Sequence, residues 1–536
     1  MANKKSAPIA VLDKQTAYSR LLDQENTMTR RYGMARMQRY RRNWEYYIGE
    51  NLPPDNVEQP LHINLVNSIT NKHVFYLFGQ WKKSLLNWSV TPEEDLFAIK
   101  VDADGEQTNK VDAKAITTAL QMEKWIYKLC ETNSANLLFS KLATNASIYG
   151  DAILRIDWIG GQVKWTSILP EHFHAKWNPS DPNIITEVIV AYPIPRAIAF
   201  ETYGTSGNPK VSIYTGDTVL TGVAMFWEHW TQDTVQMWID DIKIQEAANP
   251  YIYTDSNGIV QKGIIPFVTI PNLVLDGELY GYSDVESAFY LQDELNRRVA
   301  DEGDIINNNA HPITLLNRFT GEVDKLDIGP DSVWDMGREG EAKYLEWTGS
   351  SQGIIHEYLD RIWHFMMEMT SMTDIAFGIH QGSQRSGASL AVQMLPIIER
   401  VMFKRAIWDI KLNEIILKSL VVAEKWKARL PFAVKDIGNF RIEPVWSSVL
   451  PKDRLAVINE NVALFQSHLR SLEECLSDLG DEDVKRHYLQ IIEDLKTFAA
   501  LGIDNSTLGG SQKGSGGSNE LPQPKPLIDP AQMSES

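Results

Sequence analysis

Cysteine is nearly absent from this chain, which has only Cys130 and Cys475 in 536 residues. The two lie far apart in separate predicted helices, which excludes a disulfide framework and favours free thiols in a reducing compartment. No apolar run approaches the roughly 18 residues that a membrane helix needs, so we expect no membrane span. Residues 1–5 are not followed by an apolar core, so we expect no cleavable signal and a soluble protein made in the cytoplasm.

Motifs of common catalytic chemistry are also lacking. The sequence has no G-x-x-x-x-G-K-[ST] phosphate loop and no H-E-x-x-H zinc helix. The pattern G-x-S-x-G occurs at residues 349–353, but a nucleophile elbow needs a parallel sheet around it, so we interpret this segment as a linker. His172 and His174 would share one side of a strand without a third ligand nearby, which favours structural histidines. We therefore expect no enzyme, no cofactor and no metal.

Positive charge is the minority charge, because 52 Lys and Arg face 70 Asp and Glu and the formal net charge is −18. A general nucleic-acid coat would be basic overall, so this class is disfavoured. An acidic surface that keeps the protein soluble accounts for most individual carboxylates. The apolar content of 43% and the aromatic content of 10% exclude global disorder, and the length allows two to four domains of about 150 residues each.

One basic stretch stands out against this acidic background. Residues 1–50 form an N-terminal arm in which six arginines between Arg30 and Arg42 are interleaved with aromatic side chains. Basic residues mixed with aromatics are one signature of nucleic-acid contact. The alternative is a helix whose aromatic side packs on the core while the arginines pair with acidic neighbours. We favour the second interpretation, because exposed charge pairs contribute little and the chain is acidic.

The middle of the chain changes from helical to strand periodicity and back. Residues 63–79 and 110–148 are predicted helices, and residues 151–270 carry short strand-like runs separated by turns. We predict strands at residues 153–158, 163–165, 185–192, 211–214, 224–230, 235–238 and 264–270. Together they indicate a β-rich or α+β domain between two helical regions, so the predicted fold class is α+β.

Residues 283–423 are the stretch around which the rest is organised. Residues 283–286 fit a capping box, and apolar residues then recur at three and four through residue 309. A second predicted helix, residues 353–372, repeats this pattern. The apolar residues of the two helices are Val285, Ala288, Leu291 or Gln292, Leu295 and Val299, then Ile355, Leu359, Ile362, Met366 and Met369. Between them, residues 311–349 predict a small β-rich insert, so a helical hairpin with a displayed tip and a decorated hairpin inside a globular core both stay open.

A glycine-punctuated loop follows the second helix, at residues 374–387, and a long helical pattern starts at residue 388. Pro396 falls inside this pattern, where it removes a backbone donor and crowds the preceding turn, so we expect a kink there. Glycines before a long kinked helix make the loop a candidate hinge, with Gly378, Gly382 and Gly387 as the hinge residues. Residues 440–446 then predict a strand, residues 451–504 a helical region, and residues 505–536 a disordered Gly- and Pro-rich tail.

Several of these segments resemble the portal (head-to-tail connector) proteins of tailed bacteriophages. The resemblance rests on residues 44–49 (WEYYIG), 63–72 (INLVNSITNK), 149–155 (YGDAILR), 265–286 and 386–391 (SGASLA), in this order and spacing. It implies a portal-like domain order. The segments are a wing (51–282), a first stem helix (283–310), a clip (311–352), a second stem helix (353–373), a tunnel loop (374–387), a long kinked helix with a return wing strand (388–450) and a crown (451–504).

By the resemblance, copies of the chain close into a ring, usually a dodecamer, at one capsid vertex of the virion. Double-stranded DNA would pass through its channel, and the clip would dock the terminase large subunit and later the head–tail adaptor and tail proteins. Major capsid and scaffolding proteins would be further partners. A channel rich in carboxylates suits this role, because it repels phosphate and lets DNA slide. The alternative is a non-enzymatic DNA-binding or capsid scaffolding protein that shares only the hairpin.

The resemblance also assigns candidate channel residues. For the tunnel loop they are Ile375, Phe377, Ile379, His380, Gln384 and Arg385. For the stem they are the charged residues Asp293, Glu294, Arg297, Arg298 and Glu302. One helix alone does not tell which of the stem charges face the lumen.

Overall fold

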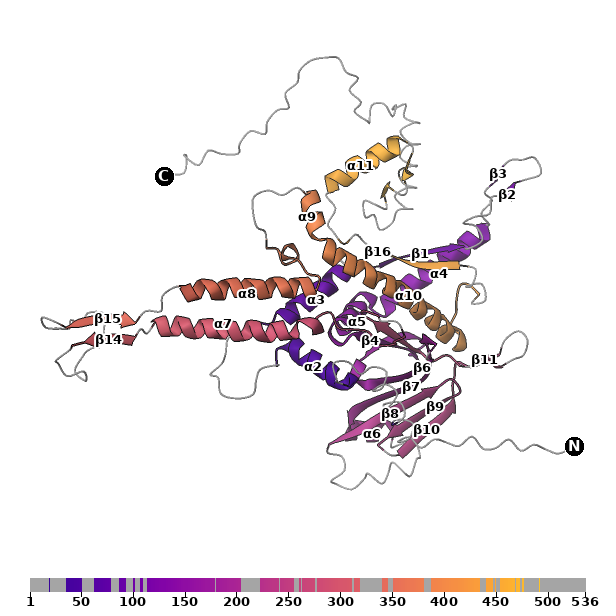
Figure 1. Cartoon of the computed structure of the whole chain (residues 1–536). Coiled ribbons are helices and arrows are strands. Elements are labelled where there is room, and N and C mark those ends of the chain that lie inside the picture. Colours follow the sequence, from indigo (N-terminus) through magenta and orange to yellow (C-terminus); the bar gives the residue numbers. More distant parts are fainter. Residues whose placement is uncertain are drawn as a thin grey trace, which may run out of the picture. The chain divides into compact units, whose positions relative to one another are not determined.

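The protein is described here from a computed structural model (Figure 1), in which the chain divides into two compact units, residues 1–449 and 450–536. The residues described are 35–50, 62–78, 86–92, 100–101, 107–108, 113–178, 180–203, 222–240, 242–254, 260–261, 263–274, 277–310, 313–318, 340–345, 350–379, 387–433, 440–446, 454–467 and 469–472, with residues 19, 449, 475, 476 and 491. Helices and strands are both well represented, which confirms the predicted α+β class.

Helices form the centre of the first unit. The helices are α2 (Arg36–Ile48), α3 (Leu65–Phe78), α4 (Ala113–Thr132), α5 (Ala135–Tyr149) and α10 (Leu395–Lys425). Aromatic rings fill the space between α3, α5 and α10, with Trp408 5.1 Å from Phe78 and 6.1 Å from Phe139 between ring centroids. Trp165 reaches the same core and donates its indole N–H to Ser419 Oγ at 2.9 Å. These residues lie up to 341 positions apart in the sequence, so the core depends on long-range contacts.

Two antiparallel sheets account for the predicted β-rich region. The first has the order β13–β4–β5, with β13 (Phe267–Pro271), β4 (Asp151–Ile159) and β5 (Gln162–Ile168). The second has the order β10–β9–β8–β7–β6, with β10 (Ile242–Ala248), β9 (Thr234–Ile239), β8 (Val223–Thr231), β7 (Asp181–Pro195) and β6 (Phe173–Asn178). Alternate residues of β8 are buried, as expected for a strand with one face on the core. The predicted strands fall within these elements, with two exceptions: the predicted strand 264–270 starts three residues before β13, and residues 211–214 lie outside the described residues.

A buried ion pair joins the two sheets. Arg155 on β4 binds Glu228 on β8 at 2.8 Å and Asp157 at 2.6 Å. Glu228 is 4% exposed and also accepts from the Trp230 indole at 3.1 Å. Burial opposes the charge on Arg155, but the two carboxylates outweigh it and raise the pKa of the guanidinium. The pairing therefore fixes how the two sheets sit against each other.

The remaining elements of the first unit are shorter. Strand β1 (Leu86–Pro92) pairs antiparallel with β16 (Phe440–Trp446), which the sequence predicted as a lone strand. Small ladders join β2 (Lys100–Val101) to β3 (Gln107–Thr108) and β11 (Tyr253–Thr254) to β12 (Val260–Gln261). Helices α6 (Arg196–Tyr203) and α9 (Gly387–Gln393) and the 3₁₀ turns η1 (Pro170–His172), η3 (Glu286–Ala288) and η5 (Asp374–Phe377) complete it.

The two long predicted helices form a hairpin. Helices α7 (Phe289–Ala310) and α8 (Ser350–Met369) lie side by side, and β14 (Ile313–Asn317) pairs antiparallel with β15 (Glu341–Leu345) beyond their ends (Figure 1). Leu295, Ile362 and Met366 are buried along the hairpin. The start of the first helix differs from the prediction. It begins at Phe289 after the η3 turn, so the predicted capping box at residues 283–286 is wrong.

The second unit contributes one described helix, α11 (Arg454–Gln466). Within it Arg470 donates to Asn461 Oδ1 at 3.0 Å, and Asn461 Nδ2 donates to the carbonyl of Cys475 at 3.4 Å. Most of the predicted crown, residues 451–504, and the whole predicted tail lie outside the described residues. No helix in the described part of the chain is long and apolar enough to span a membrane.

The aromatic core gives the first testable prediction. Trp408 is 1% exposed, whereas Trp426, just beyond the end of the same helix, is 51% exposed. Replacing Trp408 with Ala should lower the free energy of unfolding by about 3–5 kcal/mol, because the cavity cannot close fully. Trp426→Ala should change it by less than about 0.5 kcal/mol. Urea titration followed by circular dichroism measures both variants, and equal losses would contradict the assignment of Trp408 to the core.

Candidate functional site

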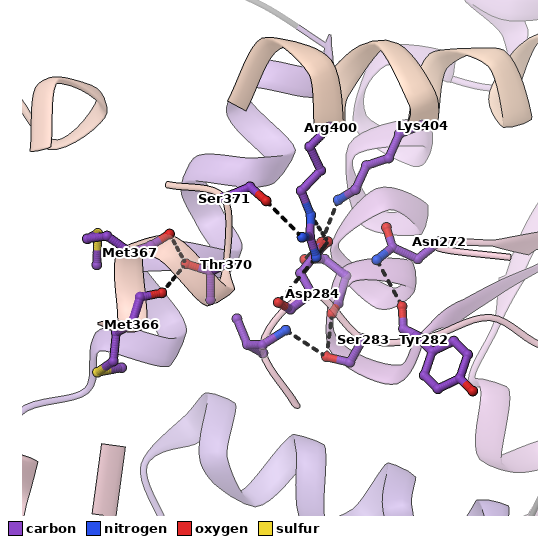
Figure 2. Close-up of polar contacts among 12 residues, drawn as sticks. Asn272, Tyr282, Ser283, Asp284, Met366, Met367, Thr370, Ser371, Arg400 and Lys404 are labelled. Carbon is purple, nitrogen blue, oxygen red and sulfur yellow. Dashed lines mark hydrogen bonds and ion pairs between the residues drawn. The ribbon is translucent and has the colours of Figure 1, made fainter. Parts of the chain in front are cut away.

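The base of the hairpin is built around one buried carboxylate, Asp284 (Figure 2). Arg400 on α10 binds its Oδ1 through Nε at 3.2 Å and Nη2 at 3.1 Å. Lys404, one turn further along α10, binds Oδ2 at 2.5 Å. Ser147 on α5 donates its hydroxyl to the same oxygen at 2.5 Å. Three separate segments of the chain therefore meet on a single side chain.

The cluster is almost completely removed from water. The side chains of Asp284 and Lys404 are 0% and 2% exposed, and that of Arg400 is 15% exposed. Burial opposes the ionisation of Asp284, but the positive charges of Lys404 and Arg400 overcome it and hold the pKa of the carboxyl far below its usual range. Asp284 is therefore ionised at neutral pH, with two cations sharing its charge.

Residues just outside the cluster hold it in place. Arg400 Nη1 donates to Ser371 Oγ at 3.3 Å, and Thr370 bonds back to the Met366 carbonyl at 2.6 Å, so the end of α8 lies against the same arginine (Figure 2). His73 on α3 is fully buried, and its electrostatic neighbours are Asp284, Lys404 and Arg400. Both ends of the hairpin are thus tied to the helical core.

Two glycine motifs bring Asp284 to this position. Gly150 lies after α5 and Gly281 lies before Asp284, and their backbones approach so closely that a Cβ on Gly281 would sit 2.5 Å from the Gly150 carbonyl oxygen. Gly150 also has a φ of +98°, which other residues rarely adopt. Asp151 accepts from the Gly281 amide at 2.6 Å, and the Asp284 amide donates to the Ser147 carbonyl at 3.0 Å. The segments YGD (residues 149–151) and YGYSD (residues 280–284) are therefore in direct contact.

The first four residues of the predicted tunnel loop form the short η5 turn. Thr373 caps it by accepting from the Ala376 amide at 3.3 Å, and Gly378 ends it with a φ of +81°. Phe377 lies 5.5 Å from Trp363 on α8, between ring centroids, and Lys72 on α3 lies 5.7 Å from the Phe377 ring. Ile375 is partly buried and Ile379 is 43% exposed.

The other loop candidates are only partly described. His380, Gly382, Gln384 and Arg385 lie outside the described residues, and Gly387 is the first residue of α9. The helical pattern is interrupted at Met394, and Pro396 is the second residue of α10. In the first turn of a helix the missing N–H of proline costs nothing, since that donor has no intrahelical partner there. Pro396 thus lies near a helix start, with the break two residues before it.

The charged residues predicted for the stem pair mainly with one another. Glu294 binds Arg297 at 2.7 Å and Arg298 at 2.8 Å, and Arg298 also binds Asp301 at 2.9 Å. Asp293 accepts a hydrogen bond of 2.5 Å from Tyr46 on α2, which together with burial raises the pKa of that tyrosine to about 12. Two contacts cross the hairpin: Glu302 lies 3.4 Å from His356, and Tyr358 donates to Glu294 at 3.3 Å.

The comparison with known protein families agrees with this architecture. Residues 33–497 match the family described as "Phage portal protein, SPP1 Gp6-like", which covers most of the 536-residue chain. The chain belongs to this family of phage portal proteins. No curated protein matches it. Membership confirms the predicted family and gives the chain a structural role as a portal protein, in a family that is not enzymatic.

The basic arm of this portal protein buries one face of α2, including two of its arginines. Arg36 is 1% exposed; it donates to the Phe173 carbonyl at 2.6 Å and lies 4.0 Å above the Tyr280 ring. Arg39 is 2% exposed. Among the described arginines of the arm, Arg41 is exposed and pairs with Glu45 at 3.3 Å. The helix packs on the core as predicted, and the contacts of Arg36 include an aromatic ring and a main-chain carbonyl.

His172, His174 and the serine of the G-x-S-x-G pattern each lie in a helix, turn or strand of the fold. The prediction that His172 and His174 share one strand is wrong, because His172 ends the η1 turn. His174 is buried on β6, with Nδ1 3.2 Å from Arg36 Nη2. Ser351 of the G-x-S-x-G pattern lies in the first turn of α8. No group of three metal-ligating side chains occurs among the residues that the structure describes.

The sequence did not predict the Asp284 cluster, because residues 283–286 were interpreted as a capping box. The signal that could have found it is weak. Arg400 and Lys404 are spaced four apart, so they share one helix face, and that face also carries the apolar residues Ile397, Val401 and Trp408. Two cations on a core-facing stripe require a buried anion, because unpaired buried charge is very costly.

The first prediction at this site concerns the charge balance. Asp284→Asn should lower the free energy of unfolding by about 3–5 kcal/mol, because it leaves two buried cations without their anion. Asp304, exposed on α7, offers a matched control, and Asp304→Asn should change stability by less than about 0.5 kcal/mol. Urea titration at neutral pH compares the two. If Asp284→Asn is as stable as the wild type, the cluster is not the anchor described here.

The second prediction concerns pH. Burial lowers the pKa of His73 from 6.5 to about 3. The unfolded chain therefore binds this proton near pH 6.5 while the folded chain does not, so stability should fall as the pH drops from 6.5 towards 3, by up to about 1.4 kcal/mol per pH unit. His73→Leu should flatten this slope, whereas His364→Leu at an exposed α8 position should leave it unchanged. Urea midpoints measured from about pH 7 to about pH 5 test this, and a slope unchanged in His73→Leu would contradict it.

Proposed function

We propose that this portal protein assembles into a ring whose channel carries double-stranded DNA into the capsid and later out of it. The observation that carries the proposal is the family match over residues 33–497. Portal membership implies a homo-oligomeric ring with capsid, terminase and tail contacts, and a place at one vertex of the virion. The ring would most simply be the dodecamer usual for such proteins, assembled in the host cytoplasm.

The hairpin supports the assignment of a stem and a clip. Helices α7 and α8 lie beside each other, and the β14–β15 ladder lies beyond them, where a docking tip is expected (Figure 1). In this proposal the tip binds the terminase large subunit during packaging and head–tail adaptor proteins afterwards. The Asp284 cluster would then transmit load between this stem and α10, because it is the ionic contact between them.

The charge of the hairpin supports passage of DNA over tight binding. Helices α7 and α8 together carry eight carboxylates and three arginines. The carboxylates are Asp293, Glu294, Asp301, Glu302, Asp304, Glu357, Asp360 and Glu368, and the arginines are Arg297, Arg298 and Arg361. Tight phosphate contacts come from Lys and Arg, so a net acidic stem disfavours a grip on DNA. The residues of η5 and the loop that follows it would narrow the bore.

The alternative function, a DNA-binding or scaffolding protein, loses part of its local support. It rested on the basic arm, and Arg36 and Arg39 are both buried. A guanidinium that stacks on Tyr280 and donates to a main-chain carbonyl is not available to a phosphate.

Electron microscopy of the purified protein tests the proposal most directly. Negative-stain images should show closed rings with a central hole, and native mass measurement should give an integral multiple of the 60.8 kDa chain. A preparation that stays monomeric or forms open, irregular oligomers over a range of salt and protein concentrations would refute the ring. In the same preparation, weak retention of linear duplex DNA is expected, since the stem is acidic.

A further inference from the structure

Helix α10 carries an apolar stripe on the side that faces away from the core. Large exposed side chains follow one another at intervals of seven, eight and seven residues: Leu395 (46% exposed), Met402 (57%), Ile410 (65%) and Leu417 (47%). Residues at these intervals lie on one face of a helix. At 1.5 Å per residue the stripe is about 33 Å long. Exposed apolar residues that are scattered singly are ordinary, whereas a continuous stripe of this length marks an interaction surface.

Charge is confined to the parts of this face near its two ends. From Met402 onward, the positions that complete the face are Ala406 and Asn413, which are both uncharged. Glu399 and Glu424 lie on the same face towards its ends, and both are exposed. The stripe is therefore apolar along its middle and bounded by carboxylates. A surface that covers it should present apolar side chains together with cations.

The stripe and the outer face of α5 lie on opposite sides of the core. Trp408 on α10 and Phe139 on α5 are buried, and their ring centroids are 6.1 Å apart. Ile410 comes two residues after Trp408, which is a rotation of about 200° round the helix axis. Leu137 comes two residues before Phe139, so it is turned by the same angle on α5, and it is 53% exposed. Ile410 and Leu137 therefore point away from each other, out of opposite sides of the α10–α5 pair.

The outer face of α5 has the chemistry that the stripe requires. Lys141 lies one turn after Leu137 on this face, and it is exposed. Ile148, further along the same face, is covered by α2. The exposed side of α2 continues the surface with Ile48, which is 38% exposed, and with Arg41. An apolar surface with cations therefore lies opposite an apolar stripe with carboxylates.

We propose that the α10 stripe of one copy of this chain is covered by the outer face of α5 and α2 of the next copy in the ring. Ile410 packs near Leu137 of the neighbouring copy, and the carboxylates at the ends of the stripe approach cations such as Lys141. The contact is head-to-tail, because its two faces are unlike and lie on opposite sides of the subunit, as a closed ring requires. This inference rests on the proposed ring and names the surfaces that close it.

Cross-linking between copies tests the contact directly. In a Cys130→Ser, Cys475→Ser background, Ile410→Cys and Leu137→Cys are combined, and the assembled protein is treated with a short bis-maleimide. Denaturing gels should show a ladder of dimers, trimers and larger species, because each copy is linked on both sides. Leu137→Cys combined with Ile198→Cys, at an exposed position on α6, is the matched control and should give no ladder. Dimers from Ile410→Cys alone would indicate a symmetric contact and overturn the proposal, as would assembled rings without a ladder.

Charge insertion measures how much the contact contributes to assembly. Ile410→Asp and Leu137→Asp should each weaken ring assembly by at least about tenfold, since burial of one large aliphatic side chain contributes more to association than a factor of ten requires. Ile198→Asp, at a 52% exposed isoleucine on α6, is the matched control and should assemble as the wild type does. Sedimentation velocity gives the protein concentration at half assembly, and circular dichroism verifies that each variant is folded.

Failure of this contact and failure of the proposed function give different results. Wild-type rings together with equal ring formation by Ile410→Asp would overturn the contact and leave the proposed function standing. The stripe would then have an occupant other than a second copy of the chain. A wild-type protein that forms no rings over a range of salt and protein concentrations would overturn both.

Discussion

Asp284 is charged at a position from which water is excluded, and segments of the first unit that are remote in sequence supply the partners of its carboxylate. Its oxygens are occupied by Lys404, Arg400 and Ser147, from two helices that are remote in sequence. Burying an ion costs several kcal/mol unless its partners are well placed, so these helices cannot shift independently. The hairpin begins five residues after Asp284, at Phe289. The direction of the hairpin is therefore set by the contacts that hold the Asp284 carboxylate.

The close glycine contact explains why two sequence motifs far apart act as one structural unit. Side chains at Gly150 or Gly281 would collide with the opposite backbone, because an added Cβ would come within 2.6 Å of a carbonyl oxygen in both directions. Only this approach brings Ser147 within reach of both Ser283 and Asp284. The α5 helix, the first β strand after it and the root of the hairpin are therefore joined at one point.

Sequence periodicity predicted the local elements well, because strands and helices carry their pattern in neighbouring residues. The strands at residues 153–158 and 224–230, the paired helices and the α+β class all follow from such patterns. Strand β1 was missed although buried residues alternate along it; what leaves no local signal is its pairing with β16, about 350 residues away. The Asp284 cluster was not predicted because the partners Arg400 and Lys404 lie more than 110 residues further on. The role of the stem charges stays a prediction, and the structure adds their mutual pairing.

Stability alone does not account for an ionic anchor at this position. A protein in which well-packed apolar side chains replace a buried ion pair is often no less stable, so the ion pair must have an advantage other than stability. An apolar contact allows two helices to slide, whereas Arg400 and Lys404 reach opposite oxygens of one carboxylate and accept only one geometry. Directional bonds at the root restrict the angle between the hairpin and α10. In the proposed ring this restriction would matter, because a small angular error at the root is magnified along a helix of 22 residues and would keep the ring from closing.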